Sequence, residues 1–206
     1  MWGIVRVAMS SPLADASLEL LFLEARTHRA WDGTPVTDGE LRKLYDLVKL
    51  APTGNNSSPA RFVFVRSPAA KERLLPALAR GNVEPTRAAA VTVIVAQDSR
   101  FYDWMVRLSP GSAERTKAAM EADPGKAERL AFQGSSIEGG YLILAARAMG
   151  LDVGPMGGFD AQKVDAEFFP DGRWRSNFLL NLGHGVREKL SPRAARLTFE
   201  EACQIL

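Results

Sequence analysis

Residues 91–96 read Val-Thr-Val-Ile-Val-Ala and are β-branched or apolar at every position. β-Branched residues favour strands. An unbroken apolar run also lacks the alternation of a strand that has one face in water. We therefore predict a strand that lies at the centre of a sheet and is buried on both faces.

Thr37 and Glu40 match a capping box, in which each side chain satisfies a free backbone N–H group at the start of a helix. The box opens a helix over residues 41–50, whose apolar residues repeat at helical spacing. Similar patterns predict helices over residues 13–24, 68–80 and 126–149 and strands over residues 62–65 and 178–183. Because helices and strands follow one another without regular alternation or an internal repeat, we prefer an α+β fold over a doubly wound sheet.

The composition is that of an ordinary globular protein, with 206 residues, 46% of them hydrophobic and 24% charged. The 26 basic and 24 acidic residues form no clustered basic stripe, so we expect no nucleic-acid partner. No run reaches the roughly 18 apolar residues of a membrane span, so we expect no membrane partner. Because a single cysteine excludes an internal disulfide, we expect a reducing compartment, the cytoplasm.

The residues near the two ends of the chain lead to one prediction each. Met9-Ser10-Ser11-Pro12 looks like a natural start that is preceded by eight further residues. We expect residues 1–12 to be a disordered extension and residues 13–206 to form a single domain. Cys203 falls in a short amphipathic helix near the other end, and we interpret it as a small core residue.

Several familiar active-site motifs are incomplete. Residues 183–188 begin like a dinucleotide-binding fingerprint, but Glu188 replaces the third glycine and the remaining chain is too short for the rest of the unit. Residues 123–126 lack the first glycine and the hydroxyl residue of a phosphate-binding loop. His28 and His184 lie far apart and lack metal-ligand spacing, so we expect no catalytic metal.

The segment Ala51–Phe64 passes from a helix to a strand through eight small or turn-forming residues. Pro52 and Pro59 fix their own φ angles, and Gly54 frees its own. The residues between them, 55–58, offer side-chain and main-chain donors close together. The segment is either a polar turn or a loop that places backbone and amide groups against a ligand.

Two further segments offer hydrogen-bond donors in a short stretch of chain. Residues 26–29 combine two guanidinium groups, a hydroxyl and an imidazole. They form either a phosphate-binding site or a solvated basic helix end. Residues 150–160 carry four glycines and a proline. In this segment the N–H groups of Gly157 and Gly158 are able to donate to a flat heteroaromatic ring, and the alternative is a flexible connection between two helices.

The helix predicted over residues 126–149 ends at Gly150, which is placed as a C-terminal cap. The middle of this helix is unusually small in its side chains, and each glycine there costs up to about 1 kcal/mol relative to alanine. The small residues are Gly134, Ser135, Ser136, Gly139 and Gly140. Close packing of either another helix or a planar ligand explains them.

In chain order these segments resemble the FMN-dependent nitroreductase family from about Leu13 to the end. Residues 25–31 are similar to the family's basic motif for the FMN phosphate, and residues 154–160 to the segment that faces N5 and O4 of the flavin. Residues 51–59 are similar to the loop that reaches the flavin of the partner subunit. Pro85 departs from the family pattern, because many members carry a basic residue there. The resemblance implies these FMN-binding residues: Arg26, Thr27, His28, Arg29, Pro52, Thr53, Gly54, Asn56, Asn82, Pro155, Met156, Gly157, Gly158, Arg193 and Arg196.

The resemblance also implies a nitroreductase-like fold, with a central, mostly antiparallel sheet flanked by helices, in an intertwined homodimer. It implies that NADH or NADPH reduces the flavin, and that a small carbonyl, nitro or quinone acceptor then takes the hydride. No dedicated acid or base is visible, so water or a hydroxyl such as that of Thr53 is expected to supply the proton.

Longer strings, among them residues 25–28, 58–61 and 199–203, are similar to the malonic semialdehyde reductases of bacterial pyrimidine utilisation. This narrower likeness implies reduction of malonic semialdehyde to 3-hydroxypropionate. The alternatives are a general nitro, quinone or enone reductase and a flavin-binding protein without turnover.

Overall fold

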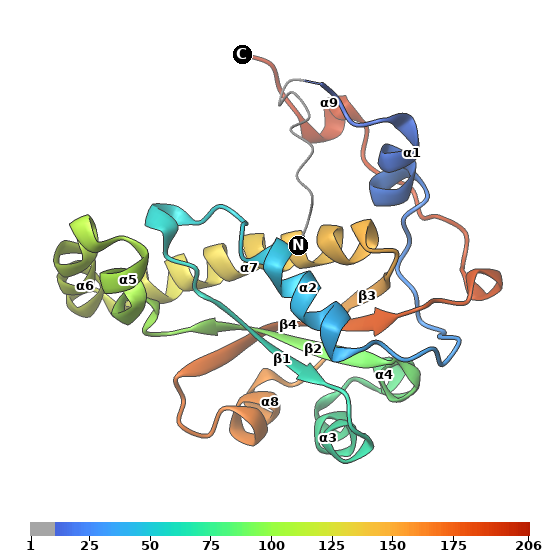
Figure 1. Cartoon of the computed structure of the whole chain (residues 1–206), viewed down its shortest axis with the longest axis horizontal. Coiled ribbons are helices and arrows are strands. Elements are labelled where there is room, and N and C mark those ends of the chain that lie inside the picture. The colour runs from blue at the N-terminus through green and yellow to red at the C-terminus, as the bar shows by residue number, and fades with distance from the viewer. Residues whose placement is uncertain (1–10) are drawn as a thin grey trace.

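The computed structural model describes residues 11–206, which contain a four-stranded antiparallel sheet in the order β1-β2-β4-β3 (Figure 1). The strands are β1 (Ala60–Val65), β2 (Val91–Asp98), β3 (Asp152–Met156) and β4 (Trp174–Gly183). The helices are α1 (Asp15–Leu18), α2 (Asp38–Val48), α3 (Pro68–Leu74), α4 (Arg80–Ala88), α5 (Met105–Leu108), α6 (Ala113–Ala122), α7 (Pro124–Ala148), α8 (Ala161–Phe168) and α9 (Phe199–Ala202). The predicted α+β fold with an antiparallel sheet is confirmed. Most of the extension expected over residues 1–12 lies outside the described residues.

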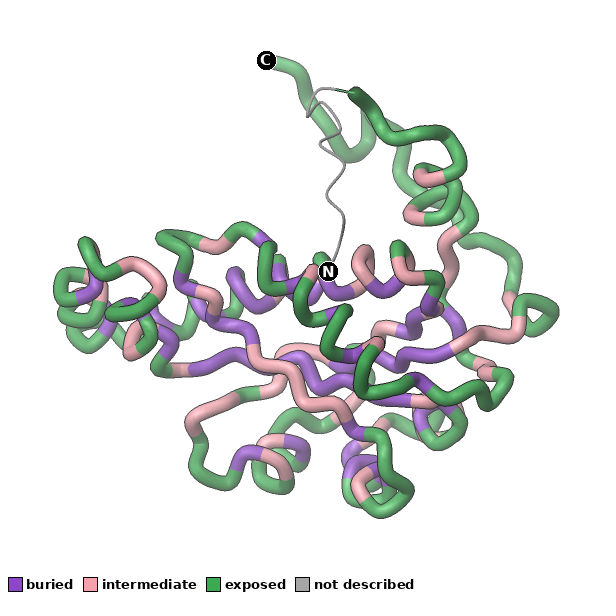
Figure 2. The backbone as a smooth tube through the Cα atoms, viewed as in Figure 1, coloured by how far each residue is buried: buried purple, intermediate pink, exposed green. Residues whose placement is uncertain are grey.

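The strand β2 lies between β1 and β4, and all eight of its residues are buried (Figure 2). Successive side chains of a strand point to opposite faces of the sheet. Val93 and Val95 pack in a core with residues of α2 and α7, whereas Ile94 and Ala96 pack with residues of α3 and α8. Figure 1 shows these helix pairs on opposite sides of the sheet. The predicted central strand, buried on both faces, is confirmed.

The capping box at the start of α2 is present in the structure. The Glu40 backbone N–H donates to Thr37 Oγ1 over 3.2 Å, and the Thr37 backbone N–H donates to Glu40 Oε2 over 2.8 Å. The predicted helix after it is confirmed. The longest helix, α7, is confirmed as well, and Gly150 follows it with a φ of 78°, as its predicted role as a cap requires.

Two predicted helices differ from the structure. The helix predicted to run to Arg80 leaves α-helical geometry after Leu74 and becomes a single 3₁₀ turn, because Pro76 has no N–H group to continue the helix. A separate helix, α4, then begins at Arg80. The helix predicted over residues 13–24 is the short α1 followed by a π-helical turn over Glu19–Leu23, and neither contains a buried residue.

The glycine-rich segment after α7 contains β3, a strand that the sequence patterns did not predict. Its pairing with β4 is regular from Asp152 to Met156. Residues 27 and 28 run beside its other edge, where the His28 N–H donates to the Val153 carbonyl over 2.9 Å. A Cβ atom on Gly154 would lie 2.4 Å from the His28 carbonyl oxygen. Glycine at 154 therefore allows this close approach of two backbones, and a flexible connection between helices is excluded here.

At two of the glycines in the middle of α7, the close neighbours are the chain's own loop and sheet. A Cβ atom on Gly134 would lie 2.5 Å from Pro59 Cγ, and one on Gly139 would lie 2.5 Å from the ring of Phe178. Gly140 has no neighbour within 4 Å of that position. Both alternatives offered by the sequence are therefore wrong for Gly134 and Gly139.

Both ends of the described chain lie away from the sheet, where Figure 1 shows α1 and α9 above α7. All residues from Ser191 to Leu206 are exposed, including Leu197 and Phe199. Cys203 is exposed too, so its interpretation as a core residue is wrong for the isolated chain. Within residues 11–206, no helix combines the length and apolar character needed to cross a membrane.

Candidate functional site

A pocket of about 530 Å³ lies where the segment after the π-helical turn meets the end of α7 and the chain after β4. Five of its lining residues were predicted from the sequence to bind FMN: Arg26, Thr27, Arg29, Arg193 and Arg196. Two further cationic residues, Arg147 and Lys189, also line the pocket and were not predicted. We call this the basic pocket.

Six cationic side chains and no carboxylate are found among the described residues that line the basic pocket. The arginines are held by neutral backbone carbonyls. Arg26 donates to Ser191 O, Arg147 donates to Leu21 O over 3.1 Å, and Arg193 donates to Leu23 O and Ala25 O. In the described part of the chain, none of these six cations forms an ion pair with Asp or Glu. Although Asp152 acts electrostatically on Arg147, the lining of the pocket is strongly positive and suits an anion of high charge density.

Arg29 is oriented by a break in the hydrogen bonding of α4. Pro85 lies inside this helix and has no N–H group to offer the carbonyl of Gly81, four residues earlier. The Arg29 guanidinium donates to that carbonyl over 2.7 Å, and to Asn82 Oδ1 over 3.3 Å. Pro85, the residue that departs from the family pattern, thus leaves an acceptor that positions Arg29 beside Asn82.

Asn82 connects the basic pocket to the glycine segment after β3. Its Nδ2 group donates to the Gly158 carbonyl over 2.9 Å, and that carbonyl also accepts from the Ala79 N–H over 2.9 Å. Gly157 and Gly158 are exposed, while Pro155 and Met156 are half-buried at the end of β3. The structure therefore brings one set of predicted FMN-binding residues together: Arg26, Thr27, Arg29, Asn82, Pro155, Met156, Gly157, Gly158, Arg193 and Arg196.

His28 lies apart from this set, although it sits between Thr27 and Arg29 in the sequence. Its side chain is only 3% exposed, and Nε2 lies 3.2 Å from Asp152 Oδ1. The burial of the imidazole lowers its pKa, an effect that Asp152 opposes and that Arg187 and Arg26 reinforce. The ring also fills the space where Gly185 would carry a Cβ atom. His28 is therefore a buried packing residue, and it does not line the basic pocket.

The loop between α2 and β1 holds three non-glycine residues with positive φ angles: Asn55 at 54°, Asn56 at 56° and Ser58 at 38°. Such backbone is costly, above all for serine, and it persists where surrounding contacts impose it. Asn56 Nδ2 donates to Leu108 O over 2.9 Å, and the Ser58 N–H donates to Thr53 Oγ1 over 3.0 Å. The Thr53 hydroxyl is thereby held as an acceptor, and its hydrogen stays free to be donated.

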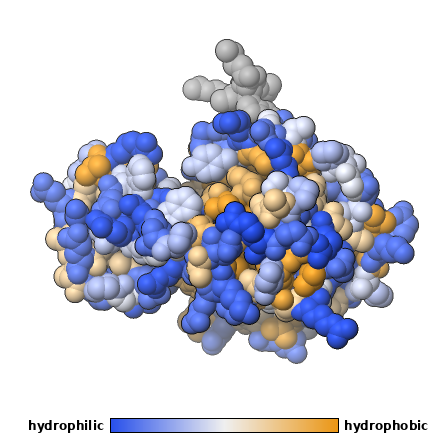
Figure 3. Space-filling view, turned by 90° about the horizontal axis from the view of Figure 1, so that it is seen from below, coloured by the Kyte–Doolittle hydropathy of each residue, from blue (hydrophilic) through white to orange (hydrophobic). Residues whose placement is uncertain are grey.

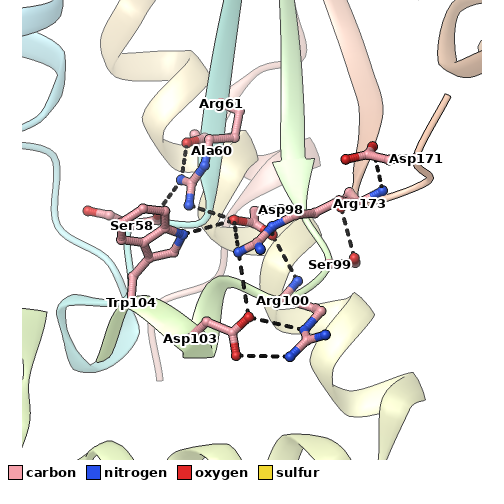
Figure 4. Close-up of polar contacts among 10 residues, drawn as sticks. All are labelled: Ser58, Ala60, Arg61, Asp98, Ser99, Arg100, Asp103, Trp104, Asp171 and Arg173. Atoms are coloured by element: carbon pink, nitrogen blue, oxygen red, sulfur yellow. Dashed lines mark hydrogen bonds and ion pairs between the residues drawn. The ribbon is translucent and has the colours of Figure 1, made fainter. Parts of the chain in front are cut away.

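Asp98 anchors the end of this loop. Its fully buried carboxylate accepts from Arg61 over 2.7 Å, from Arg173 over 3.1 Å and from Trp104 over 3.2 Å (Figure 4). Arg61 also donates to the carbonyl of Ser58 over 3.0 Å. The sequence patterns did not single out Asp98, because a lone acid at the end of a strand carries no motif.

The loop and the basic pocket lie far apart within one chain. Thr53 is next to Gly134 of α7, whereas Arg147 of the basic pocket is 13 residues further along this helix. At 1.5 Å per residue the separation is about 20 Å. The predicted residues Pro52, Thr53, Gly54 and Asn56 therefore form a second group that does not meet the first group within one chain.

Exposed apolar side chains follow one face of α7, at Leu130, Ile137 and Tyr141. Leu18, Leu20, Phe22 and Leu23 are likewise exposed in and after α1. Exposed apolar side chains that gather in this way are a common feature of interaction surfaces.

Residues 23–184 match the model of the nitroreductase family. A relative from Rhodopseudomonas palustris, provisionally named an NADH dehydrogenase/NAD(P)H nitroreductase, is 54% identical over 96% of this chain and 100% of its own. A relative of the same provisional name from Ralstonia nicotianae is also 54% identical, over 94% of this chain and 98% of its own.

Solved structures share the fold at lower identity. A provisionally named nitroreductase from Bacillus subtilis has a TM-score of 0.86 at 22% identity, covering 94% of this chain and 100% of its own. A provisionally named nitroreductase from Exiguobacterium sibiricum, solved in complex with FMN, has a TM-score of 0.82 at 20% identity, covering 96% of this chain and 100% of its own. Both agree with the predicted nitroreductase-like fold.

Proposed function

Because the chain belongs to the nitroreductase family, we propose that it is an FMN-dependent NAD(P)H oxidoreductase that reduces a small acceptor. The observation that carries this proposal is the basic pocket, in which six cations face no carboxylate among its described lining residues. A phosphate monoester supplies the negative charge that this donor set requires. The reducing compartment expected from the single cysteine, the cytoplasm, is part of the proposal.

The chain's own residues fit FMN beyond its phosphate. When bound, FMN supplies a ring that accepts hydride from NADH or NADPH and passes it to the acceptor. Arg26, Arg193 and Arg196 hold the phosphate, and the exposed Gly157 and Gly158 offer N–H groups to the polar edge of the ring. Asn82 fixes the position of Gly158 through the hydrogen bond to its carbonyl.

The proposal includes a homodimer, because the predicted site is divided within one chain. The loop that contains Thr53 lies about 20 Å along α7 from the basic pocket of the same chain, so it serves the pocket of a second copy. The exposed apolar faces of α7 and α1 and the exposed segment from Ser191 onward provide the contact surface. Thr53, with its free hydroxyl hydrogen, is then the protein's proton-donating contact to the acceptor, and water is the alternative source.

For the physiological acceptor we propose malonic semialdehyde, which takes a hydride and a proton to give 3-hydroxypropionate. The support is the likeness of residues 25–28, 58–61 and 199–203 to malonic semialdehyde reductases. The alternative is a general nitro, quinone or enone reductase. The third hypothesis is that the protein binds the flavin in the same pocket without turnover.

The test begins with the purified protein and its spectrum. We expect yellow protein that retains FMN through gel filtration and loses its visible absorbance when NADH or NADPH is added without oxygen. Protein that stays colourless after incubation with FMN contradicts both enzyme readings, and yellow protein that neither nucleotide bleaches favours binding without turnover. A kcat/KM for malonic semialdehyde far below the values for a quinone and a nitroarene rejects the semialdehyde assignment.

A further inference from the structure

A second pocket, of about 480 Å³, lies between the loop after α2, α6 and the first half of α7. It contains Gly54 and Asn55, and so adjoins Thr53. Figure 3 shows the part of the molecule that contains α5 and α6 as a lobe set off from the main body by a notch. The pocket's floor is apolar and includes the buried Phe101 and Met120. We call it the loop pocket.

The loop pocket carries two positive charges that nothing in its lining neutralises. Arg115 of α6 and Lys126 of α7 both line it, and no Asp or Glu is among its described lining residues. Neither side chain has an ion pair or a hydrogen bond with another described residue, in contrast to Lys117 of α6, which pairs with Glu121 over 3.8 Å. Thr116 and Gln133 add neutral polar groups to the lining.

We infer that the loop pocket binds the carboxylate of a small anionic acceptor, and that Arg115 and Lys126 determine this specificity. The inference rests on the proposed function, in which the neighbouring Thr53 faces the flavin of the second copy. Two cations above an apolar floor suit an acceptor that carries one negative charge on a short carbon chain or a single ring.

In a single chain the loop pocket is open to solvent, because Leu130 and Ile137 at its rim are exposed. These residues belong to the apolar face of α7 that a second copy covers in the proposed dimer. Covering the pocket excludes water and strengthens the attraction between the two cations and a bound carboxylate. The charge preference is therefore a property of the assembled dimer.

The test uses two acceptors that differ in charge and little in shape, 4-nitrobenzoate and 4-nitrobenzamide, with the FMN-loaded protein and excess NADPH or NADH. We compare the wild type with the double variant Arg115→Gln/Lys126→Gln. We expect kcat/KM for 4-nitrobenzoate to fall about ten- to a hundredfold, as for lost hydrogen bonds to a charged group, with kcat/KM for the amide changing less than about twofold. The fall should appear in KM, because the carboxylate binds equally in the ground and transition states.

The matched control is Lys117→Gln/Arg129→Gln, which removes the same charge from the same two helices at positions that do not line the loop pocket. We expect this control to retain the preference for the anion. An equal fall in the control means that the net charge of the lobe, and not the pocket, attracts the acceptor. An equal fall for both acceptors also overturns the inference, as does a rise in KM for NADPH with both acceptors unaffected, which assigns the pocket to the dinucleotide.

A failure of the proposed function is distinguishable from a failure of this inference. If neither NADH nor NADPH reduces the FMN-loaded wild type, the proposed function fails. In that case, or if the wild type reduces neither nitroarene, calorimetry with benzoate and benzamide decides the inference without turnover. Benzoate binding to the wild type that is weakened at least about tenfold in the double variant supports the inference. Absent benzoate binding, or binding equal in both proteins, rejects it.

Discussion

The imidazole of His28 lies with Nε2 3.2 Å from Asp152 Oδ1, and Asp152 in turn accepts the Gly185 N–H through Oδ2 over 2.9 Å. Through these contacts residues 27 and 28 are held against β3 and the chain that follows β4. The neighbouring Arg26 and Arg29 are thereby positioned to line the basic pocket. His28 positions the pocket without entering it.

The buried imidazole predicts a loss of stability in acid. Burial lowers the pKa of His28 in the folded protein below its ordinary value of 6.5. Below about pH 6.5 the unfolded chain therefore binds more protons at this position than the folded chain, and stability falls as the pH falls. Urea unfolding at pH 7.5 and pH 5.5 measures this, with His28→Asn as comparison. The variant should be less stable at pH 7.5 but lose less between the two pH values; an identical loss in both proteins contradicts the assignment.

Removing the carboxylate of Asp98 should be strongly destabilising. Asp98→Ala leaves the guanidinium groups of Arg61 and Arg173 without their shared buried partner, and we expect a loss of about 3–5 kcal/mol of unfolding free energy. Asp46→Ala is the control, because its ion pair with Lys49 is exposed and should contribute less than about 1 kcal/mol. Chemical denaturation measures both variants. A loss at Asp98 no larger than at Asp46 would show that the cluster in Figure 4 does not hold the loop.

Alanine substitutions at the neighbouring glycines Gly139 and Gly140 of α7 should change the stability of the protein in opposite directions. A methyl group at Gly139 would lie 2.5 Å from the Phe178 ring, so Gly139→Ala should destabilise by about 1–3 kcal/mol through overpacking. Gly140 has open space at the same position, so Gly140→Ala should stabilise by about 0.5–1 kcal/mol through helix propensity. Thermal unfolding in the presence of FMN compares the pair. Equal effects of the two substitutions would refute the packing of α7 on β4.

Arg26 lines the basic pocket, and its guanidinium is held at the Ser191 carbonyl. If it binds the FMN phosphate, Arg26→Ala should weaken FMN binding by about 1.5–3 kcal/mol, the range for a hydrogen bond to a charged group. Arg129→Ala, outside this pocket, is the matched control. Fluorescence titration of the apoprotein with FMN gives the two dissociation constants. Equal FMN affinities in both variants would contradict the assignment of Arg26 to the phosphate and favour its interpretation as a solvated basic residue.

Ile137 is 46% exposed on α7 and lies on the face expected to contact a second copy. Ile137→Glu places a charge in that contact, and we expect the dimer to dissociate at micromolar concentration with loss of retained FMN. Light scattering measures the mass of the wild type and the variant. Lys117→Gln, on α6, changes the net charge by the same one unit and serves as the charge control. A wild type that is monomeric at micromolar concentration contradicts the proposed dimer directly.

Elements that form through local interactions could be predicted from the amino-acid sequence. The capping box of Thr37 and Glu40 starts α2 through contacts three residues apart, and the apolar run at 91–96 requires a strand buried on both faces. The order of the motifs from Arg26 to Arg196 was also sufficient to indicate the family, which the match over residues 23–184 confirms.

Packing between distant segments determines which of the predicted residues meet. Arg26 and Arg147 are separated by more than one hundred residues, yet they line one pocket. They meet because residue 27 pairs with β3, the strand that follows α7, and this pairing brings Arg26 beside the end of α7. His28 was assigned to the phosphate by its neighbours in the sequence, but the close approach at Gly154 and Gly185 places its ring in the interior. The sequence patterns did not predict β3, because glycine and proline disfavour strands locally. Gly154 and Pro155 fit a strand here only because β3 pairs with β4 and the backbone of residue 28 approaches closely. Local patterns specify helices and strands, whereas the side chains gathered in a site depend on packing between distant parts of the chain.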